Sequence, residues 1–210
     1  MAADNSNTIK SKEDGLFDAE NFTVKHPLQF TWTLWFDNPR LKKANESWED
    51  SLKNIMSFDT VEDFWCLYES IMPASKIQTG SNYSIFKDGI KPMWEDENNV
   101  LGGKWVITIN KPDKKNLDEW WLHAILASIG GILEHDNSDE ICGLVMSSRK
   151  AHDRIALWTR TAASMELQHA IGTKLRGALK LPKKCQITYQ THDSALASGS
   201  SYRTKALYHA

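Results

Sequence analysis

The sequence lacks the features that mark several common classes of protein. Its three cysteines, Cys66, Cys142 and Cys185, are odd in number, far apart and without a Cys-x-x-Cys pair. This spacing argues against both a disulfide framework and a zinc site, and it is typical of a reducing compartment. No apolar run approaches the length of a membrane-spanning helix, and the N-terminus lacks the apolar segment of a signal peptide. We therefore expect no association with a membrane.

A strong charge of either sign is also missing. Lys and Arg together number 25 and Asp and Glu 27, so the formal net charge is −2. Such a chain has no overall positive field that would attract polyanions non-specifically. A nucleic-acid partner would have to be a short piece held by a local basic cluster, and we expect no binding to DNA.

Common enzyme signatures are absent as well. The chain has no Gly-x-Gly-x-x-Gly, Walker loop, His-Glu-x-x-His or Gly-x-Ser-x-Gly sequence. The seven histidines are scattered, and none pairs with a cysteine or another histidine at metal-ligand spacing. We expect no catalytic residue, no metal site and no cofactor. An enzyme would need a constellation assembled only in the folded chain.

The periodicity of the chain predicts a single α+β domain. Residues 1–25 are polar and show no sustained period, so we interpret them as a mobile N-terminal tail before a domain of residues 26–210. A first helix is expected from the N-cap pair Asp59 and Glu62 to Pro73. Two more helices are expected at about 118–129 and 164–179, with strands at 28–36, 83–86, 104–110, 141–148, 154–161 and 185–190. This order predicts a mainly antiparallel sheet with helices on one face and the other face open.

Tryptophan is unusually abundant, with nine in 210 residues. Trp48 and Trp94 lie in separate polar segments with almost no apolar neighbours. Either indole could simply fold back onto the core. Together, two such indoles are suited to gripping a flat aromatic ring, above all a cationic one.

Glu95 follows Trp94 directly and could read the edge of a bound base. A carboxylate accepts two hydrogen bonds at once, and the Watson–Crick edge of guanine offers two adjacent N–H donors, whereas adenine does not. The alternative is that Glu95 is one more solvated acid in an acidic loop. The tryptophan beside it favours base recognition.

A cation and a further indole share one face of the strand expected at 154–161. Alternation places Arg154 and Trp158 on the same side, opposite the core-facing Ile155 and Leu157. Arg149 and Lys104, at the ends of other strands, could join Arg154 in a phosphate-binding cluster. Singly, each of these cations is more often an ordinary surface charge.

Several long segments in the same order resemble the eukaryotic translation initiation factor 4E family of mRNA cap-binding proteins, from about His26 to Ser201. They are HPLQFTWTLWF, FDTVEDFW, YSIFKDGIKPMWEDENN, GGKWVITINK, ICGLVMSSR and RIALWT. The resemblance implies a curved antiparallel sheet of about eight strands with three helices on its convex face, and a 7-methylguanosine cap as ligand. It implies that Trp48 and Trp94 sandwich the methylated base while Glu95 binds its N–H groups. Trp158 would touch the N7 methyl group, and Arg149, Arg154 and Lys104 would hold the phosphates.

The same resemblance implies a partner surface on the convex face for a helical segment of initiation factor 4G or of 4E-binding repressor proteins. Its residues would be His26, Pro27, Val61, Trp65, Leu122, Leu126 and Gly130. Core packing is the alternative for Trp65. Ser200 matches the family's regulatory phosphorylation site, within a divergent tail.

The sequence departs from the family pattern in both expected surfaces. Lys104 stands where many relatives have arginine, and Ala151 occupies a position that is often basic. His123 and Gly131 stand where relatives usually carry glutamates that face basic residues of the partner.

Three hypotheses follow. The chain is an initiation factor that binds capped mRNA and recruits 4G, or a specialised isoform or repressor that binds the cap but engages 4G weakly. The third is a cap-processing enzyme, which the missing motifs disfavour. We expect the protein in the cytoplasm, with the nucleus as a further possible location.

Overall fold

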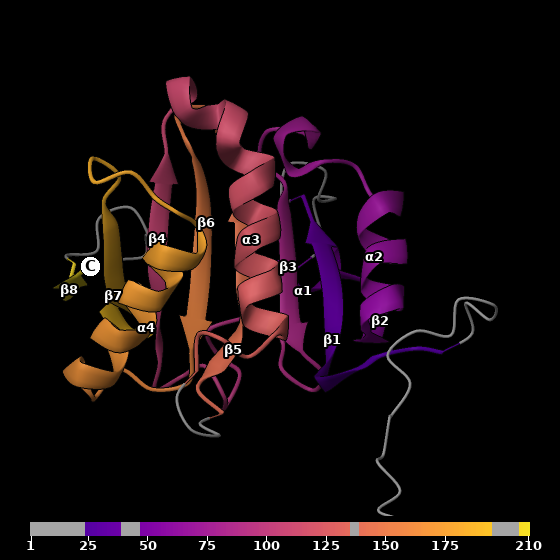
Figure 1. Cartoon of the computed structure of the whole chain (residues 1–210), viewed down its shortest axis with the longest axis horizontal. Coiled ribbons are helices and arrows are strands. Elements are labelled where there is room, and N and C mark those ends of the chain that lie inside the picture. The colour runs from indigo at the N-terminus through magenta and orange to yellow at the C-terminus, as the bar shows by residue number, and fades with distance from the viewer. Residues whose placement is uncertain (1–23, 39–46, 135–138, 195–205) are drawn as a thin grey trace, which may run out of the picture.

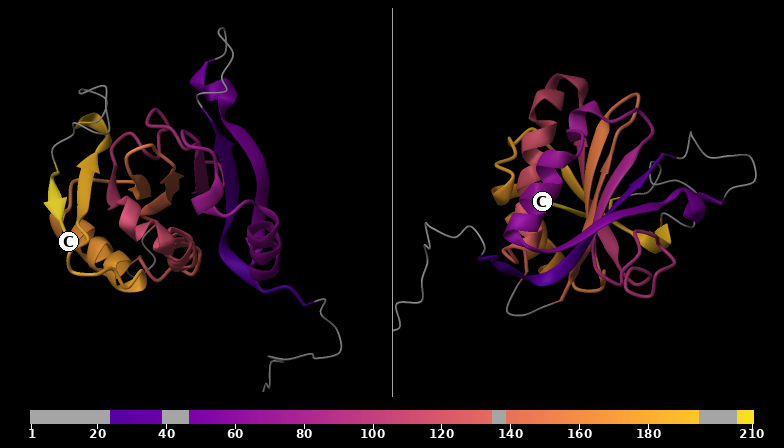
Figure 2. Two further views of the ribbon diagram at one scale, coloured as in Figure 1. Left: turned by 90° about the horizontal axis from the view of Figure 1, so that it is seen from above. Right: turned by 90° about the vertical axis from the view of Figure 1, so that its right-hand side faces the viewer.

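The computed structural model describes residues 24–38, 47–134, 139–194 and 206–210 of the chain. Within them, eight antiparallel strands form one curved sheet in the order β2-β1-β3-β5-β6-β4-β7-β8 (Figures 1 and 2). The strands are β1 (Pro27–Asp37), β2 (Lys53–Thr60), β3 (Asn82–Lys87), β4 (Gly103–Ile109), β5 (Ile141–Ser147), β6 (Asp153–Thr159), β7 (Ile187–Thr191) and β8 (Tyr208–His209). The predicted architecture is confirmed.

Three longer helices cover one face of this sheet (Figures 1 and 2). They are α2 (Val61–Ser70), α3 (Leu117–Ile129) and α4 (Met165–Ala178). The helix α1 (Trp48–Ser51) and the 3-10 turns η2 (Ala74–Lys76) and η3 (Lys111–Asn116) are shorter. Among the helices of the described ranges, none is long and apolar enough to span a membrane.

Alternation along the strands divides the sheet into two faces. In β4, Trp105, Ile107 and Ile109 are at most 1 % exposed and belong to the main core beneath the helices. Lys104 and Val106 point to the opposite face, because successive side chains of a strand alternate. The alternation predicted for this strand therefore holds, and it leaves a second face available for a ligand.

The first long helix begins one residue later than predicted. Thr60, not Asp59, is its N-cap residue, and its hydroxyl oxygen accepts a hydrogen bond from the backbone N–H of Asp63 at 3.2 Å. Glu62 instead accepts bonds from the backbone N–H of His26 at 2.8 Å and from its ring Nδ1 at 2.6 Å. These bonds hold the pKa of the Glu62 carboxyl at about 2. Glu62 thus ties the start of β1 to α2, a long-range contact that the local capping pattern did not show.

Sequence reasoning missed the strands at the two edges of the sheet. β2 falls partly in the polar stretch 38–57, and only Phe58 and Thr60 are buried in it. An edge strand with little buried surface needs no apolar alternation, since pairing with β1 stabilises it through the backbone. β8 has two residues, too few to show any period.

Helix α4 approaches the sheet closely at Gly172. A Cβ added there would lie 2.6 Å from a ring carbon of Trp105, whose side chain is fully buried. We expect Gly172→Ala to lower the free energy of unfolding by about 1–3 kcal/mol, the usual result of overpacking a core. Urea denaturation followed by tryptophan fluorescence measures this change.

Gly177 in the same helix provides the matched control. Nothing lies within 4 Å of the position of an added Cβ there. Gly177→Ala should therefore raise the free energy of unfolding by roughly 0.5–1 kcal/mol through helix propensity. Equal effects of the two substitutions would contradict the close packing of α4 on Trp105.

Candidate functional site

The face of the sheet opposite the helices contains a cavity of about 550 Å³. Paired residues on neighbouring strands of an antiparallel sheet point to the same side, so they form rows across it. One such row runs through Ser84, Val145, Ala156 and Val106. The cavity is lined by Asp37, Asn82, Ser84, Pro92, Met93, Trp94, Glu95, Lys104, Val106, Val145, Ser147, Arg149, Arg154, Ala156 and Trp158.

Trp158 forms part of the apolar floor of this cavity. Its ring contacts Phe86 edge-on, with centroids 5.5 Å apart, and the His192 ring at 4.2 Å. Burial, together with the charge of Lys104, lowers the pKa of His192 to about 3, so its ring is neutral at physiological pH. Trp158 is therefore fixed between two rings, with 5 % of its surface left exposed. His192 was not among the predicted site residues, and its place beneath Trp158 follows only from the fold.

Lys104 brings a buried positive charge to the cavity. Its Nζ lies 5.7 Å from the ring centroid of Trp94 and 5.6 Å from that of Trp158, so both indoles face the ammonium group. Burial, with a smaller contribution from the nearby charge of Arg154, lowers the pKa of Lys104 to about 8. A buried cation of this kind is suited to an anionic ligand group, which would restore part of the solvation it has lost.

Arg149 is oriented by its neighbours before any ligand binds. Its guanidinium donates to Oδ1 of Asn82 at 2.8 Å and to the backbone oxygen of Ser148 at 2.9 Å. The amide of Asn82 donates in turn to both carboxylate oxygens of Asp37, at 3.0 and 2.9 Å. Arg154 pairs with Ser147 across β5 and β6 and lines the same cavity. Two guanidinium groups and one ammonium group thus converge on one cavity.

Trp94 and Glu95 lie in the loop of residues 91–99, which internal hydrogen bonds hold in shape. The buried amide of Asn99 donates to the backbone oxygens of Lys91 at 2.9 Å and Met93 at 2.8 Å. The carboxylate of Asp96 accepts from the backbone N–H of Lys91 at 2.9 Å. Trp94 is half-buried, packing against Trp158 and its apolar neighbours, while Glu95 is exposed.

Trp48 occupies the first position of α1. A capping box defines this start, since the side chain of Ser47 accepts from the backbone N–H of Asp50 and the Asp50 carboxylate accepts from the Ser47 N–H. Glu49 forms an exposed ion pair with Lys91 at 3.0 Å, which links α1 to the loop that carries Trp94. The side chain of Trp48 lies outside the described part of the structure, so its predicted stacking role stays a prediction.

The fold thus brings together six of the seven predicted ligand-binding residues: Trp94, Glu95, Trp158, Arg149, Arg154 and Lys104. Sequence reasoning missed Asp37 and Asn82, which orient Arg149, and the row that includes Ser84 and Val145. Alternation could have placed Ser84 and Val145 on the open face. The role of Asn82 arises from a contact between residues 67 positions apart.

The predicted partner residues lie on the side of the sheet that carries the helices. His26 and Pro27 are exposed at the start of β1, and Val61 and Trp65 on α2 are each 37 % exposed. Trp65 also contacts Phe64, with ring centroids 5.0 Å apart, so it packs partly and remains accessible. On α3, Leu122 and Leu126 are half-buried, and Gly130 is exposed at its C-cap. Ser200 lies outside the described residues.

Comparison with known proteins identifies the family of this chain. The family model for eukaryotic initiation factor 4E matches residues 27–207. The chain belongs to the eukaryotic initiation factor 4E family. It is 47 % identical over 182 residues to eukaryotic translation initiation factor 4E1 of Drosophila melanogaster, covering 86 % of this chain and 68 % of that protein. It is 44 % identical to the Aplysia californica factor 4E, covering 88 % of this chain and 85 % of the relative.

Solved structures of the 4E family share the fold. The Ascaris suum eIF4E-3 complex with an m2,2,7G cap superposes with a TM-score of 0.76 at 44 % identity, covering 80 % of this chain and 92 % of that one. A Caenorhabditis elegans eIF4E-3 complex with the 4E-binding protein Mextli and a cap analog superposes with a TM-score of 0.79 at 38 % identity. The match covers 89 % of this chain and 100 % of that one. The 4E family consists of cap-binding initiation factors and not of enzymes, as the sequence led us to expect.

The buried charge of Lys104 should destabilise this 4E protein when no ligand is bound. Its pKa is about 8 in the fold and 10.5 in the unfolded chain, so the penalty is complete below pH 8 and disappears as the pH rises to 10.5. We expect Lys104→Met to raise the free energy of unfolding at pH 7 by about 1–3 kcal/mol, since one pKa unit corresponds to about 1.4 kcal/mol. Chemical denaturation at several pH values measures both the gain and its decline.

Lys111→Met is the control, because that lysine is exposed on η3. It should change the stability little at any of these pH values. A loss of stability in Lys104→Met would show that the ammonium group is better stabilised in the fold than its burial indicates.

Proposed function

We propose that this chain binds the 7-methylguanosine cap of mRNA in the cavity on the open face of its sheet and thereby serves translation initiation. The observation that carries this proposal is the convergence of Trp94, Glu95 and Trp158 with three cations in one cavity of about 550 Å³. That volume is in the range of small-molecule sites. The solved complexes of relatives with m7G and m2,2,7G caps support it.

Each group has a role in this proposal that follows from its chemistry. Methylation at N7 makes the guanine cationic, which strengthens its stacking on electron-rich indoles such as Trp94. Glu95 accepts hydrogen bonds from the two N–H donors of the guanine edge. The cations hold the phosphate chain, Arg149 in a fixed orientation and Lys104 as a point charge. The indole of Trp48 would complete the stack.

Recruitment of initiation factor 4G to the helical face is the second part of the proposal. Val61 and Trp65 on α2, with Leu122 and Leu126 on α3, offer partly exposed apolar side chains to an amphipathic helix. The complex of the C. elegans relative with Mextli supports a 4E-binding protein as a further partner. Because translation initiation takes place in the cytoplasm, we propose a cytoplasmic location, with the nucleus as a second one.

The alternative is a repressor or specialised isoform that binds the cap and engages 4G weakly. Its basis is the absence of acidic side chains at His123 and Gly131, since a basic partner segment would lose two attractions. Gly131 adopts φ +69°, a conformation that L side chains rarely adopt, so a glutamate is hard to restore there. His123→Glu is therefore the better substitution for testing this idea.

A titration with nucleotides tests the cap site. We expect 7-methyl-GTP to quench the tryptophan fluorescence at much lower concentration than GTP, and the affinity to fall when the salt concentration is raised. Trp94→Ala should weaken binding of 7-methyl-GTP by about 1–3 kcal/mol, the usual contribution of one stacking contact.

Trp120→Phe is the control for loss of a tryptophan signal, because Trp120 is 5 % exposed on α3 within the main core. It should leave the affinity unchanged. Equal responses to methylated and unmethylated nucleotide would overturn the cap-binding proposal.

A pull-down with a helical 4G peptide tests the partner surface. Capture by the wild-type chain should be lost in Trp65→Ala, because large aromatic side chains dominate the binding energy of such interfaces. Cap affinity should stay the same in this variant, and measuring it shows that the variant is folded. Weak capture by the wild type, strengthened by His123→Glu, would favour the repressor over the initiation factor.

A further inference from the structure

The loop of residues 91–99 needs an attachment to the sheet if it is to present Trp94 and Glu95 at the cavity. Its internal hydrogen bonds fix its own shape, but they do not fix its place relative to β4 and β6. The ion pair of Lys91 with Glu49 is exposed, with both side chains 55 % accessible, and such pairs contribute little. Trp94 packs on the apolar cluster that includes Val106 and Trp158, which holds one part of the loop against the sheet. The far end of the loop, at residues 96–99, needs a polar attachment of its own.

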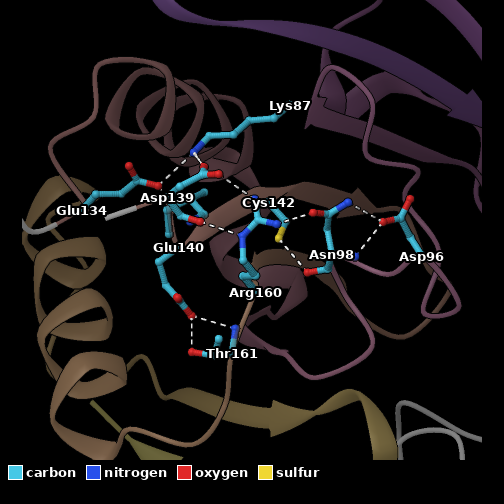
Figure 3. Close-up of polar contacts among 10 residues, drawn as sticks. Lys87, Asp96, Asn98, Glu134, Asp139, Glu140, Cys142, Arg160 and Thr161 are labelled. Carbon is cyan, nitrogen blue, oxygen red and sulfur yellow. Dashed lines mark hydrogen bonds and ion pairs between the residues drawn. The ribbon is translucent and has the colours of Figure 1, made fainter. Parts of the chain in front are cut away.

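Asn98 supplies this attachment. Its side-chain oxygen accepts a hydrogen bond from the guanidinium of Arg160, and its backbone oxygen accepts one from the thiol of Cys142 at 3.3 Å. Its backbone N–H and its side-chain amide both donate to Oδ1 of Asp96, at 2.9 and 3.0 Å. Asn98 therefore joins the folded loop to the ends of β5 and β6 (Figure 3).

Two hydrogen bonds to Asp139 orient Arg160 towards Asn98, and one of them goes to the backbone. It follows β6, and its Nε and one terminal nitrogen donate to the backbone oxygen and a carboxylate oxygen of Asp139, each at 2.8 Å. The other terminal nitrogen is the one that reaches Asn98. A planar guanidinium bound twice on one side presents its remaining donor in a fixed direction, which a flexible ammonium group cannot do.

The chain of charges continues into the protein. Asp139 pairs with Lys87 at 2.8 Å, and Lys87 also pairs with Glu134 at 3.0 Å. Lys87 is 5 % exposed and lies over the ring of Phe30, 4.0 Å from its centroid. Glu134 accepts from the backbone N–H of Ile141 at the start of β5. Figure 3 shows the side chains of this network connected in the order Glu134, Lys87, Asp139, Arg160, Asn98 and Asp96.

We propose that Arg160, supported by Asp139, is a positioning residue that fixes the loop of Trp94 and Glu95 for cap recognition. This inference rests on the proposed function of the cavity. Arg160 does not line that cavity; it lines a separate one of about 220 Å³ with Lys87, Asp139 and Asn98. Arg160 therefore acts on the ligand through the loop. If the loop is correctly placed for only part of the time, the affinity for the ligand falls in proportion to that fraction.

The experiment compares Arg160→Lys with the wild type by two measurements at the same temperature. Affinity for 7-methyl-GTP should fall about tenfold if the loop is correctly placed for about a tenth of the time. In the ligand-free protein, hydrogen exchange at the backbone amides of Asn98 and Asn99, which bond to Asp96, should become severalfold faster. Exchange within β4 and β6 should not change.

Two further variants sharpen the result. Arg176→Lys is the matched control, since this arginine of α4 also bonds backbone oxygens of a loop, those of Pro182 and Cys185, away from the cavity. It should lower the melting temperature without changing cap affinity or exchange at Asn98. Asn98→Ala removes the acceptor on the loop side, and combining it with Arg160→Lys should add little to either single effect.

Unchanged exchange at Asn98 and Asn99 in Arg160→Lys would overturn the proposal, as would a loss of affinity no larger than that of Arg176→Lys. The two proposals fail separately. If the wild type bound no 7-methyl-GTP, the proposed function would be wrong, while the exchange measurement would still decide whether Arg160 positions the loop.

Discussion

The alternation of side chains across the sheet links the core to the ligand cavity. A strand such as β4 buries Trp105 and Ile107 beneath the helices, and this packing forces Lys104 and Val106 onto the opposite face. Neighbouring strands repeat the arrangement, so the cavity floor is as rigid as the core behind it. Without the apolar packing of α2, α3 and α4 on one face, the residues of the other face would have no common orientation.

The rigid floor carries groups that would be unfavourable elsewhere. Lys104 is almost fully buried beside two indoles, and His192 is buried in its neutral form against Trp158. Their burial lowers both pKa values, because the charged forms lose solvation. Arg149, in contrast, has its hydrogen bonds supplied by Asn82 and the backbone. The protein thus holds charge in place before binding, which reduces the reorganisation that a phosphate ligand would require.

The rim of the cavity differs physically from its floor. Trp94 and Glu95 lie in a loop whose backbone is held by hydrogen bonds, while the Trp94 ring packs on the apolar cluster of the floor. Such a loop depends on polar attachments to the sheet, and Asn98 is where the described contacts concentrate. A site of this kind has two parts. Its floor is a fixed surface for phosphates, and the position of its rim depends on a few specific side chains.

The pattern of residues along the chain predicted the architecture, and six of the seven expected ligand-binding residues line one cavity. Period-two alternation separated Trp105 from Lys104 and Ile155 from Arg154, and the isolated Trp94 with Glu95 indicated a base-binding pair. The edge strand β2 and the supporting roles of Asn82, His192 and Arg160 became visible only in the folded chain. These depend on contacts between residues far apart in the chain, whereas periodicity reports only on neighbours within one strand or helix.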